Sequence, residues 1–152
     1  GPWASDGGRH ALRSLPVRRK AHDAAGLEKA HGLAARPVVA NVRHPALPSH
    51  PAHAIWARDF TGANGLFSFV LKDVPRAAVD TFVETLDLFA MGFSWGGFES
   101  LLIPCDQQLS RCEGDWTDTR AGPLLRIHIG LEATSTLTVD RDSGFKAMAD
   151  AL

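Results

Sequence analysis

The 152 residues of this chain are enough for one domain, and 45% of them are hydrophobic, so a single core is expected. Sixteen basic and 17 acidic side chains leave a formal net charge of −1, which gives no general attraction to nucleic acid or to an anionic membrane. No apolar run approaches the roughly 20 residues that cross a bilayer, and the N-terminus lacks the pattern of a signal peptide. A cytoplasmic protein is therefore expected.

The first segment, residues 1–36, is predicted to be a linker followed by helices. Residues 1–8 contain three glycines and a proline, which favour irregular structure. Alanine and leucine then recur at three- and four-residue spacing, as on one face of a helix, but Pro16 lacks the N–H that a helix interior needs. Two helical pieces are expected. Because the chain begins with Gly and not Met, it is interpreted as a possible fragment.

The second segment, residues 37–152, contains several short runs of β-branched, aromatic and aliphatic residues that predict strands. These runs are 38–44, 65–71, 88–94, 98–104 and 123–132. The third and fourth runs meet at Trp95, Gly96 and Gly97, where a hairpin or a sharp corner is expected. Glycine pairs weaken strands, so a close approach of another group to this backbone is also expected.

Two helices are predicted between and after these strands. One begins near Asp73 and Pro75 and buries the stripe Val79, Phe82, Val83 and Leu86. The other begins near Thr136 and carries Leu137, Phe145, Met148 and Leu152 on one side. The prolines of 44–53 exclude regular structure, and the polar stretch 107–122 is predicted to be loop-rich. The expected fold class is α+β, a two-layer sandwich in which helices cover one face of a small, mostly antiparallel sheet.

Arg126 is the main candidate for a binding residue. In the last predicted strand the side chains alternate between two faces, and Arg126 lies opposite the apolar face that packs on the helices. An unpaired charge in an otherwise apolar strand is costly, so Arg126 needs an anionic partner. That partner is either an Asp or Glu of this chain, in a structural ion pair, or the carboxylate of a substrate held by the planar guanidinium.

Other candidate sites are weaker. His44, His50 and His53 cluster around prolines without an added carboxylate or cysteine, so no metal site is expected. Arg58 and Asp59 are interpreted as a local ion pair or cap. Two cysteines, Cys105 and Cys112, cannot form a disulfide framework and are interpreted as ordinary thiols. The chain contains no GxGxxG, GxxxxGK or HExxH motif.

Three stretches together resemble a known family: HPALPSHPAHAIWARDFTGANGLFSFVL, LFAMGFSWGGFESLLIP and LLRIHIGLE. They are similar to the C-terminal domain of the cystathionine β-lyases, in the Cys/Met-metabolism family of fold-type I pyridoxal-phosphate enzymes. The likeness runs from about Ser5 to Leu152. The family motifs S-[LW]-G-G-x-E-S-L and R-[LIF]-[SH]-[IV]-G-[LI]-E are both present, and Trp95 in the second place of the first motif resembles the β-lyase branch.

The resemblance implies roles for three residues in substrate binding. Arg126 would bind the α-carboxylate of an amino-acid substrate, Ser94 would assist through its backbone or hydroxyl, and Trp95 would form a wall of the pocket. No catalytic residue is expected in this chain, because the family's cofactor-binding lysine lies in a large domain N-terminal to this region. The resemblance implies pyridoxal 5'-phosphate as the cofactor of the full-length enzyme, but not as a covalent ligand of this chain. It also implies a homo-oligomer, because members of the family are tetramers.

Two functions are therefore open at this point. One is the C-terminal part of a carbon–sulfur lyase of methionine biosynthesis that converts cystathionine to homocysteine, pyruvate and ammonia, inactive without the large pyridoxal-phosphate domain. The alternative is a non-catalytic binding or interaction module, or a folded remnant of such an enzyme. Pro16 marks a departure from the family, because the long helix that leads out of the large domain is expected to be shortened there.

Overall fold

The structure is a computed structural model that describes residues 2–108 and 122–152. Within these residues it has four α-helices and one four-stranded antiparallel sheet with the strand order β1-β2-β4-β3. The helices are α1 (Pro2–Ala34), α2 (His53–Asp59), α3 (Arg76–Glu84) and α4 (Thr134–Asp150). The strands are β1 (Val39–Arg43), β2 (Leu66–Leu71), β3 (Leu101–Pro104) and β4 (Leu124–His128).

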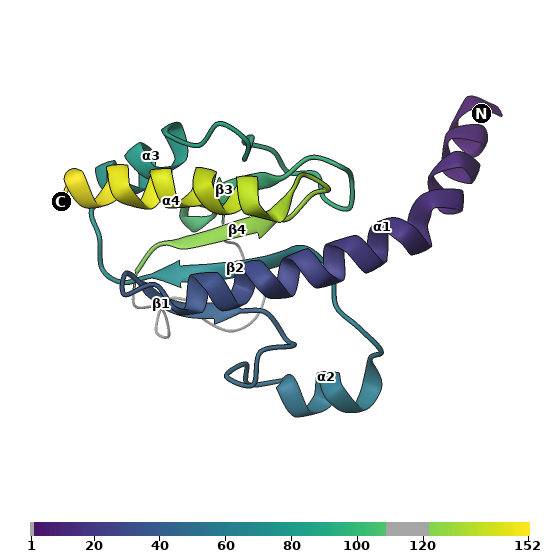
Figure 1. Cartoon of the computed structure of the whole chain (residues 1–152), viewed down its shortest axis with the longest axis horizontal. Helices are drawn as coiled ribbons and strands as arrows, with labels where there is room; N and C mark the ends of the chain where they lie inside the picture. Colours follow the sequence, from purple (N-terminus) through teal and green to yellow (C-terminus); the bar gives the residue numbers. More distant parts are fainter. Residues whose placement is uncertain (1, 109–121) are drawn as a thin grey trace.

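One hydrophobic core joins α1, α3 and α4 to one face of the sheet, so the predicted α+β two-layer fold is confirmed (Figure 1). The central strands supply alternate side chains to this core, as strand geometry requires: Phe67, Phe69 and Leu71 from β2, and Leu125 and Ile127 from β4. Val79, Phe82 and Val83 of the predicted stripe are buried in α3, which packs on α4 with the rings of Phe82 and Phe145 4.7 Å apart. Leu86 lies beyond the end of α3 and is half-buried against the core. Leu152, in contrast, lies beyond the end of α4 and is exposed.

The N-terminal helix differs from its prediction, because α1 is one helix that begins at Pro2 and contains Pro16. A proline near the start of a helix costs little, since the first N–H groups have no intrahelical partner. At Pro16 the helix is exposed, and the carbonyl of Ala11 accepts from Arg18 Nη1 at 3.1 Å and from Ser14 Oγ at 3.3 Å. The helix bends in its N-terminal part but continues (Figure 1).

The segment before β3 also differs from its prediction. Residues 88–94 form no strand, and β3 begins only at Leu101. The two stretches meet in a single bridge between Ala90 and Leu101 that is parallel, which excludes a hairpin. Met91, Phe93, Trp95 and Phe98 are all exposed, so this stretch lacks the buried side that a half-buried strand requires. Helix α2, which the sequence analysis does not predict, follows the predicted proline-rich loop directly.

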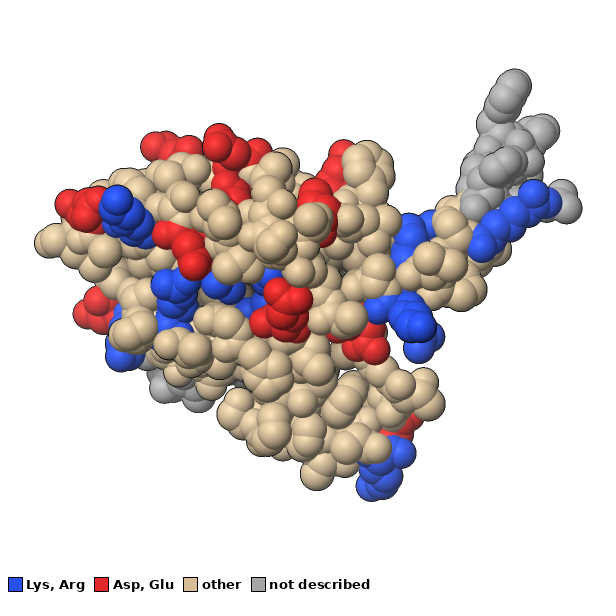
Figure 2. All heavy atoms as spheres, viewed as in Figure 1, with Lys and Arg blue, Asp and Glu red and all other residues tan. Residues whose placement is uncertain are grey.

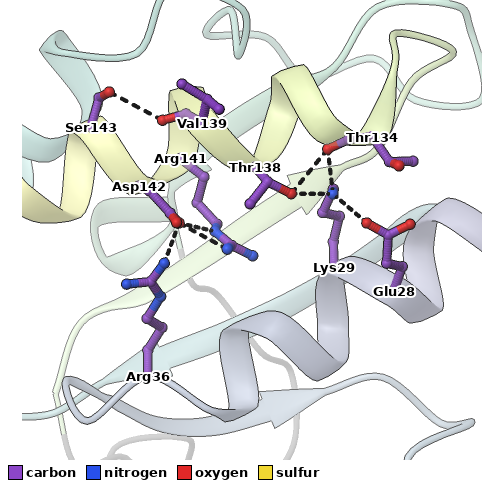
Figure 3. Close-up of polar contacts among 9 residues, drawn as sticks. All are labelled: Glu28, Lys29, Arg36, Thr134, Thr138, Val139, Arg141, Asp142 and Ser143. Carbon is purple, nitrogen blue, oxygen red and sulfur yellow. Dashed lines mark hydrogen bonds and ion pairs between the residues drawn. The ribbon is translucent and has the colours of Figure 1, made fainter.

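Polar side chains tie α1 to α4 (Figure 3). Lys29 is only 1% exposed, and its Nζ donates to Glu28, to the Thr134 carbonyl and to the Thr138 hydroxyl at 2.5–2.7 Å. Asp142 of α4 forms ion pairs with Arg36, which follows α1, and with Arg141. Each buried cation in this seam therefore has a partner, as burial of a charge requires.

The charges on the surface are mixed in sign. Figure 2 shows acidic and basic side chains interspersed on the face in view, with basic side chains along the N-terminal part of α1. This face therefore offers no extended field of one sign to a polyanion. Among the helices that the structure describes, none is long and apolar enough to cross a membrane.

Candidate substrate-carboxylate site

Arg126 lies near the middle of β4, on the sheet face opposite the main core. The register places it between Ser68 of β2 and Ile103 of β3. Its side chain is half-buried, and Nη2 donates to the carbonyl of Phe93 at 2.8 Å and to that of Gly92 at 3.3 Å. The guanidinium therefore lies directly beneath the segment 92–100, which carries both Ser94 and Trp95.

The ion pair that was one alternative for Arg126 is not found within residues 2–108 and 122–152. In this part of the chain, the ion pairs of Asp and Glu involve other cations. One end of the guanidinium is held by two neutral carbonyls, which fix its position without neutralising its charge. An arginine in this state is suited to a carboxylate that comes from outside these residues.

Two further side chains of the stretch 126–132 bind the same segment. His128 accepts from the Gly96 N–H through Nε2 at 2.8 Å and contacts the Glu99 carbonyl through Nδ1 at 3.0 Å. Glu132 accepts from the N–H of Ser100 at 2.9 Å and from its hydroxyl at 2.8 Å. The two sequence motifs are thus parts of one structure, in which side chains of the later motif hold the backbone of the earlier one.

Glycine is suited to its positions in the two motifs for different structural reasons. Gly96 has a φ of +77°, a conformation that glycine adopts without the Cβ penalty, but nothing lies within 4 Å of a Cβ built there or at Gly97. The close approach lies instead at Gly130, where a Cβ would meet the Phe98 carbonyl oxygen and lie 2.5 Å from the Glu99 carbonyl carbon. The resemblance implies that Gly96 and Gly97 approach a ligand and the large domain, which lie outside these residues, so that approach stays a prediction.

A cavity of about 380 Å³ opens beside this segment. Trp95, Gly96 and His128 form one side of it, and α1 contributes Arg19 and His22 to its lining. Ser94 is exposed, and neither Ser94 nor Arg126 lines the cavity. The structure thus brings the three predicted residues to one region, with Trp95 at the cavity and Arg126 under the adjoining backbone.

Sequence reasoning missed the contributions of His128, Gly130 and Glu132. The strand alternation that singled out Arg126 also placed His128 on its face, and this was the available signal. Nothing in the sequence by itself indicated that these side chains would bind the backbone of a segment some 30 positions earlier. Such contacts depend on how the segment crosses the sheet.

The other predicted candidates behave as local structure. The Nδ1 atoms of His44 and His50 accept from nearby backbone N–H groups, and burial lowers the pKa of His44 below its usual value. In the described ranges, no three His, Cys, Asp or Glu side chains are grouped as metal ligands. Arg58 and Asp59 form the expected ion pair, with Nε and Oδ1 2.7 Å apart.

Cys105 is half-buried, and its burial raises the pKa of the thiol, which suits an unreactive cysteine. Cys112 lies outside the described residues.

Comparisons with known proteins show the family to which this chain belongs. A family model described as Cys/Met metabolism PLP-dependent enzyme matches residues 9–146. The chain is 44% identical to cystathionine β-lyase of Salmonella typhimurium and 42% identical to cystathionine β-lyase MetC of Escherichia coli. Each of these alignments spans 136 residues, which is 88% of this chain and 34% of the relative. The fold also matches a crystal structure of cystathionine γ-synthase from Xanthomonas oryzae pv. oryzae in complex with aminoacrylate and cysteine, with a TM-score of 0.82. The sequence identity is 31%, and the match covers 93% of this chain and 37% of the γ-synthase chain.

The fold and the matched motifs are those of a class of pyridoxal-phosphate-dependent enzymes of amino-acid metabolism. Within that class, the chain belongs to the family of Cys/Met metabolism PLP-dependent enzymes. It spans about a third of the length of the curated relatives it matches.

The lysines of this chain do not fit covalent binding of the family cofactor. Lys29 is buried and its ammonium group already donates three hydrogen bonds. Lys20, Lys72 and Lys146 are exposed to water, whereas a lysine that forms a catalytic Schiff base lies in a site that excludes water. The chain offers no lysine prepared for attack on the cofactor aldehyde.

We expect that mixing the isolated chain with pyridoxal phosphate produces no stable visible absorbance band beyond that of the free cofactor. The reason is that the ammonium group of Lys29 already donates three hydrogen bonds and the other three lysines are exposed to water. Absorbance spectra before and after borohydride reduction and dialysis, with mass spectrometry of the product, provide the measurement. A band that a single lysine replacement abolishes would contradict this expectation.

The exposed apolar side chains predict association of the isolated chain. They lie on α1 and on the segment before β3, and comprise Leu12, Leu15, Val17, Met91, Phe93, Trp95 and Phe98, each at least 42% exposed. Because exposed apolar surface favours association, we expect the chain to bind a hydrophobic dye or to self-associate. Dye fluorescence and light scattering across a dilution series test this, and a monomer that binds no dye would count against it.

Proposed function

We propose that this chain supplies the substrate-carboxylate part of a carbon–sulfur lyase of the cystathionine β-lyase type. The complete enzyme would convert cystathionine to homocysteine, pyruvate and ammonia. The observation that carries the proposal is the position of Arg126, half-buried, fixed by two carbonyls and without an ion pair among the described residues. Trp95 and the higher identity to β-lyases than to the γ-synthase structure support the β-lyase branch.

Arg126 would orient the substrate. Its Nη2 is held by the Gly92 and Phe93 carbonyls, which leaves the remaining guanidinium N–H groups for the two oxygens of an α-carboxylate. The exposed hydroxyl of Ser94 lies on the same segment as those two carbonyls and would assist, and Trp95 would limit the space for the substrate side chain. Pyridoxal phosphate supplies the electron sink in this family, and its covalent attachment is proposed to lie outside this chain.

A chimeric enzyme tests the proposal. The matched segment of the Escherichia coli relative is replaced by residues 9–146 of this chain, and pyruvate release from cystathionine is measured. We expect pyruvate release, and cystine serves as the competing substrate that reports on preference. A chimera that folds and carries the cofactor but releases no pyruvate would contradict the lyase proposal and favour a non-catalytic binding module.

A further inference from the structure

His128 binds the backbone of the 92–100 segment through both of its ring nitrogens. The Gly96 N–H can only donate, so Nε2, which lies 2.8 Å away, has no proton. The Glu99 carbonyl can only accept, so Nδ1, which lies 3.0 Å away, has the proton. Together the two contacts define one form of the side chain, the neutral imidazole protonated at Nδ1.

The surroundings of His128 also favour the neutral ring. The side chain is 3% exposed, and its ring centroid lies 5.1 Å from that of His22 on α1. His22 contacts the Ile129 carbonyl through Nδ1. Burial is the largest cause of a lowered pKa at His128; His22 and Arg126 lower it further, while the Glu99 carbonyl and the Glu132 carboxylate oppose the change.

We propose that His128 is a positioning residue, whose neutral imidazole holds Gly96 in its left-handed conformation and thereby sets where Trp95 stands at the cavity. Three observations converge on this role. The bonded residue, Gly96, has a φ of +77°; it follows Trp95 directly; and Trp95, Gly96 and His128 line the same cavity. The inference rests on the proposed function only for the identity of the substrate beside Trp95, and not for the positioning itself.

Protonation would reverse this arrangement. A second proton can attach only at Nε2, where it would face the Gly96 N–H and turn an acceptor into a competing donor. The folded-state pKa lies below the usual value of 6.5, so the bond is present above that value and is lost as the pH falls through the folded-state pKa. The segment is therefore held at neutral pH and released in acid.

Two substitutions separate the two contacts of the ring. In His128→Gln the amide oxygen can replace Nε2 as the acceptor for Gly96, and it does not titrate. In His128→Asn the shorter amide can replace Nδ1 as the donor to Glu99 but leaves Gly96 without an acceptor. His44→Gln is the matched control, because His44 is also buried and also accepts from a backbone N–H, but in the loop after β1.

The experiment is NMR on the isotopically labelled full chain, following the Gly96 and Gly97 amides, the His128 ring nitrogens and the Trp95 indole. At neutral pH we expect the His128 ring to be protonated at Nδ1, and we expect the Gly96 amide hydrogen to exchange more slowly than that of Gly97. His128→Asn should accelerate Gly96 exchange about tenfold or more and shift the Trp95 indole signal. His128→Gln should keep Gly96 protected and remove its acid titration, whereas His44→Gln should leave both readouts unchanged.

The outcomes are decisive even when a variant fails to fold, since the Gly96 signal can be titrated in the unchanged chain. Gly96 that is unprotected at neutral pH, or that shows no shift as His128 titrates, overturns the positioning role. Equal rates of Gly96 amide hydrogen exchange in His128→Asn and in the unchanged chain would also overturn the positioning role. Failure of the proposed lyase function is a separate result, because it would appear as absent pyruvate release in the chimera with these NMR results intact.

Discussion

Replacing Arg126 by alanine in the chimeric enzyme is expected to raise KM for cystathionine by about a hundredfold or more. Two charge-assisted bonds to the substrate carboxylate would be lost, each worth about 1.5–3 kcal/mol. The fold should remain, because the only described partners of the side chain are the Gly92 and Phe93 carbonyls. Initial-rate kinetics give KM, and a thermal melt of the same sample gives the stability.

Two variants give this prediction its control. Arg126→Lys should recover only part of the loss, since an ammonium group cannot reproduce the planar fork. Arg58→Ala removes an exposed arginine whose described partner is the neighbouring Asp59, and it should leave KM unchanged. An unchanged KM in Arg126→Ala, or loss of cooperative unfolding in that variant, would mean that Arg126 is a structural residue.

Replacing Gly130 by alanine is expected to destabilise the chain by about 1–3 kcal/mol, with overpacking as the cause. The added methyl group would meet the Phe98 carbonyl oxygen and lie 2.5 Å from the Glu99 carbonyl carbon and from Glu132 Oε2. Two of these atoms belong to the backbone of the segment that His128 and Glu132 bind, so relief of the clash requires the two motifs to move apart. Denaturant unfolding measures the change in the free energy of unfolding.

Gly97→Ala is the matched control for this prediction. It adds the same methyl group in the earlier motif, at a position where nothing lies within 4 Å of the added Cβ and φ is not positive. The free energy of unfolding should then change little, and the Gly96 amide should keep its protection. Equal destabilisation by the two substitutions would show that the close approach at Gly130 is not what determines the stability of this region.

Much of the fold could be predicted from the sequence, because the periodicity of apolar residues within single elements indicates their secondary structure. The alternation in β2 and the three- and four-residue spacing in α3 each place one side of the element in the core. Strand β4 is buried on both faces except at Arg126, which is half-buried. The same alternation placed Arg126 on the face opposite the core. In these elements the local pattern and the tertiary environment favour the same structure.

The failed predictions arose where the local pattern and the tertiary environment disagree. The apolar run 88–94 resembles a strand, yet it forms a single parallel bridge. The N–H groups of Asp87, Leu88 and Phe89 instead donate to the Asp140 carboxylate at 2.8–3.3 Å. That carboxylate comes from α4, about 50 positions later. At Pro16 the helix is exposed, so water can hydrogen-bond the carbonyl that lacks its backbone donor, and the helix continues through the proline.

The sequence by itself determined the elements of the sheet and the core helices, the face on which Arg126 lies, and the family motifs, since each depends on residue types at short spacing. Only the tertiary structure decided how the motifs meet. The crossing of the 92–100 segment over β4 gives His128 its two backbone partners, gives Glu132 the N–H of Ser100, and makes Gly130 necessary. These are contacts between backbone groups and distant side chains, and backbone groups are the same in every residue, so the sequence contains no local signal for them.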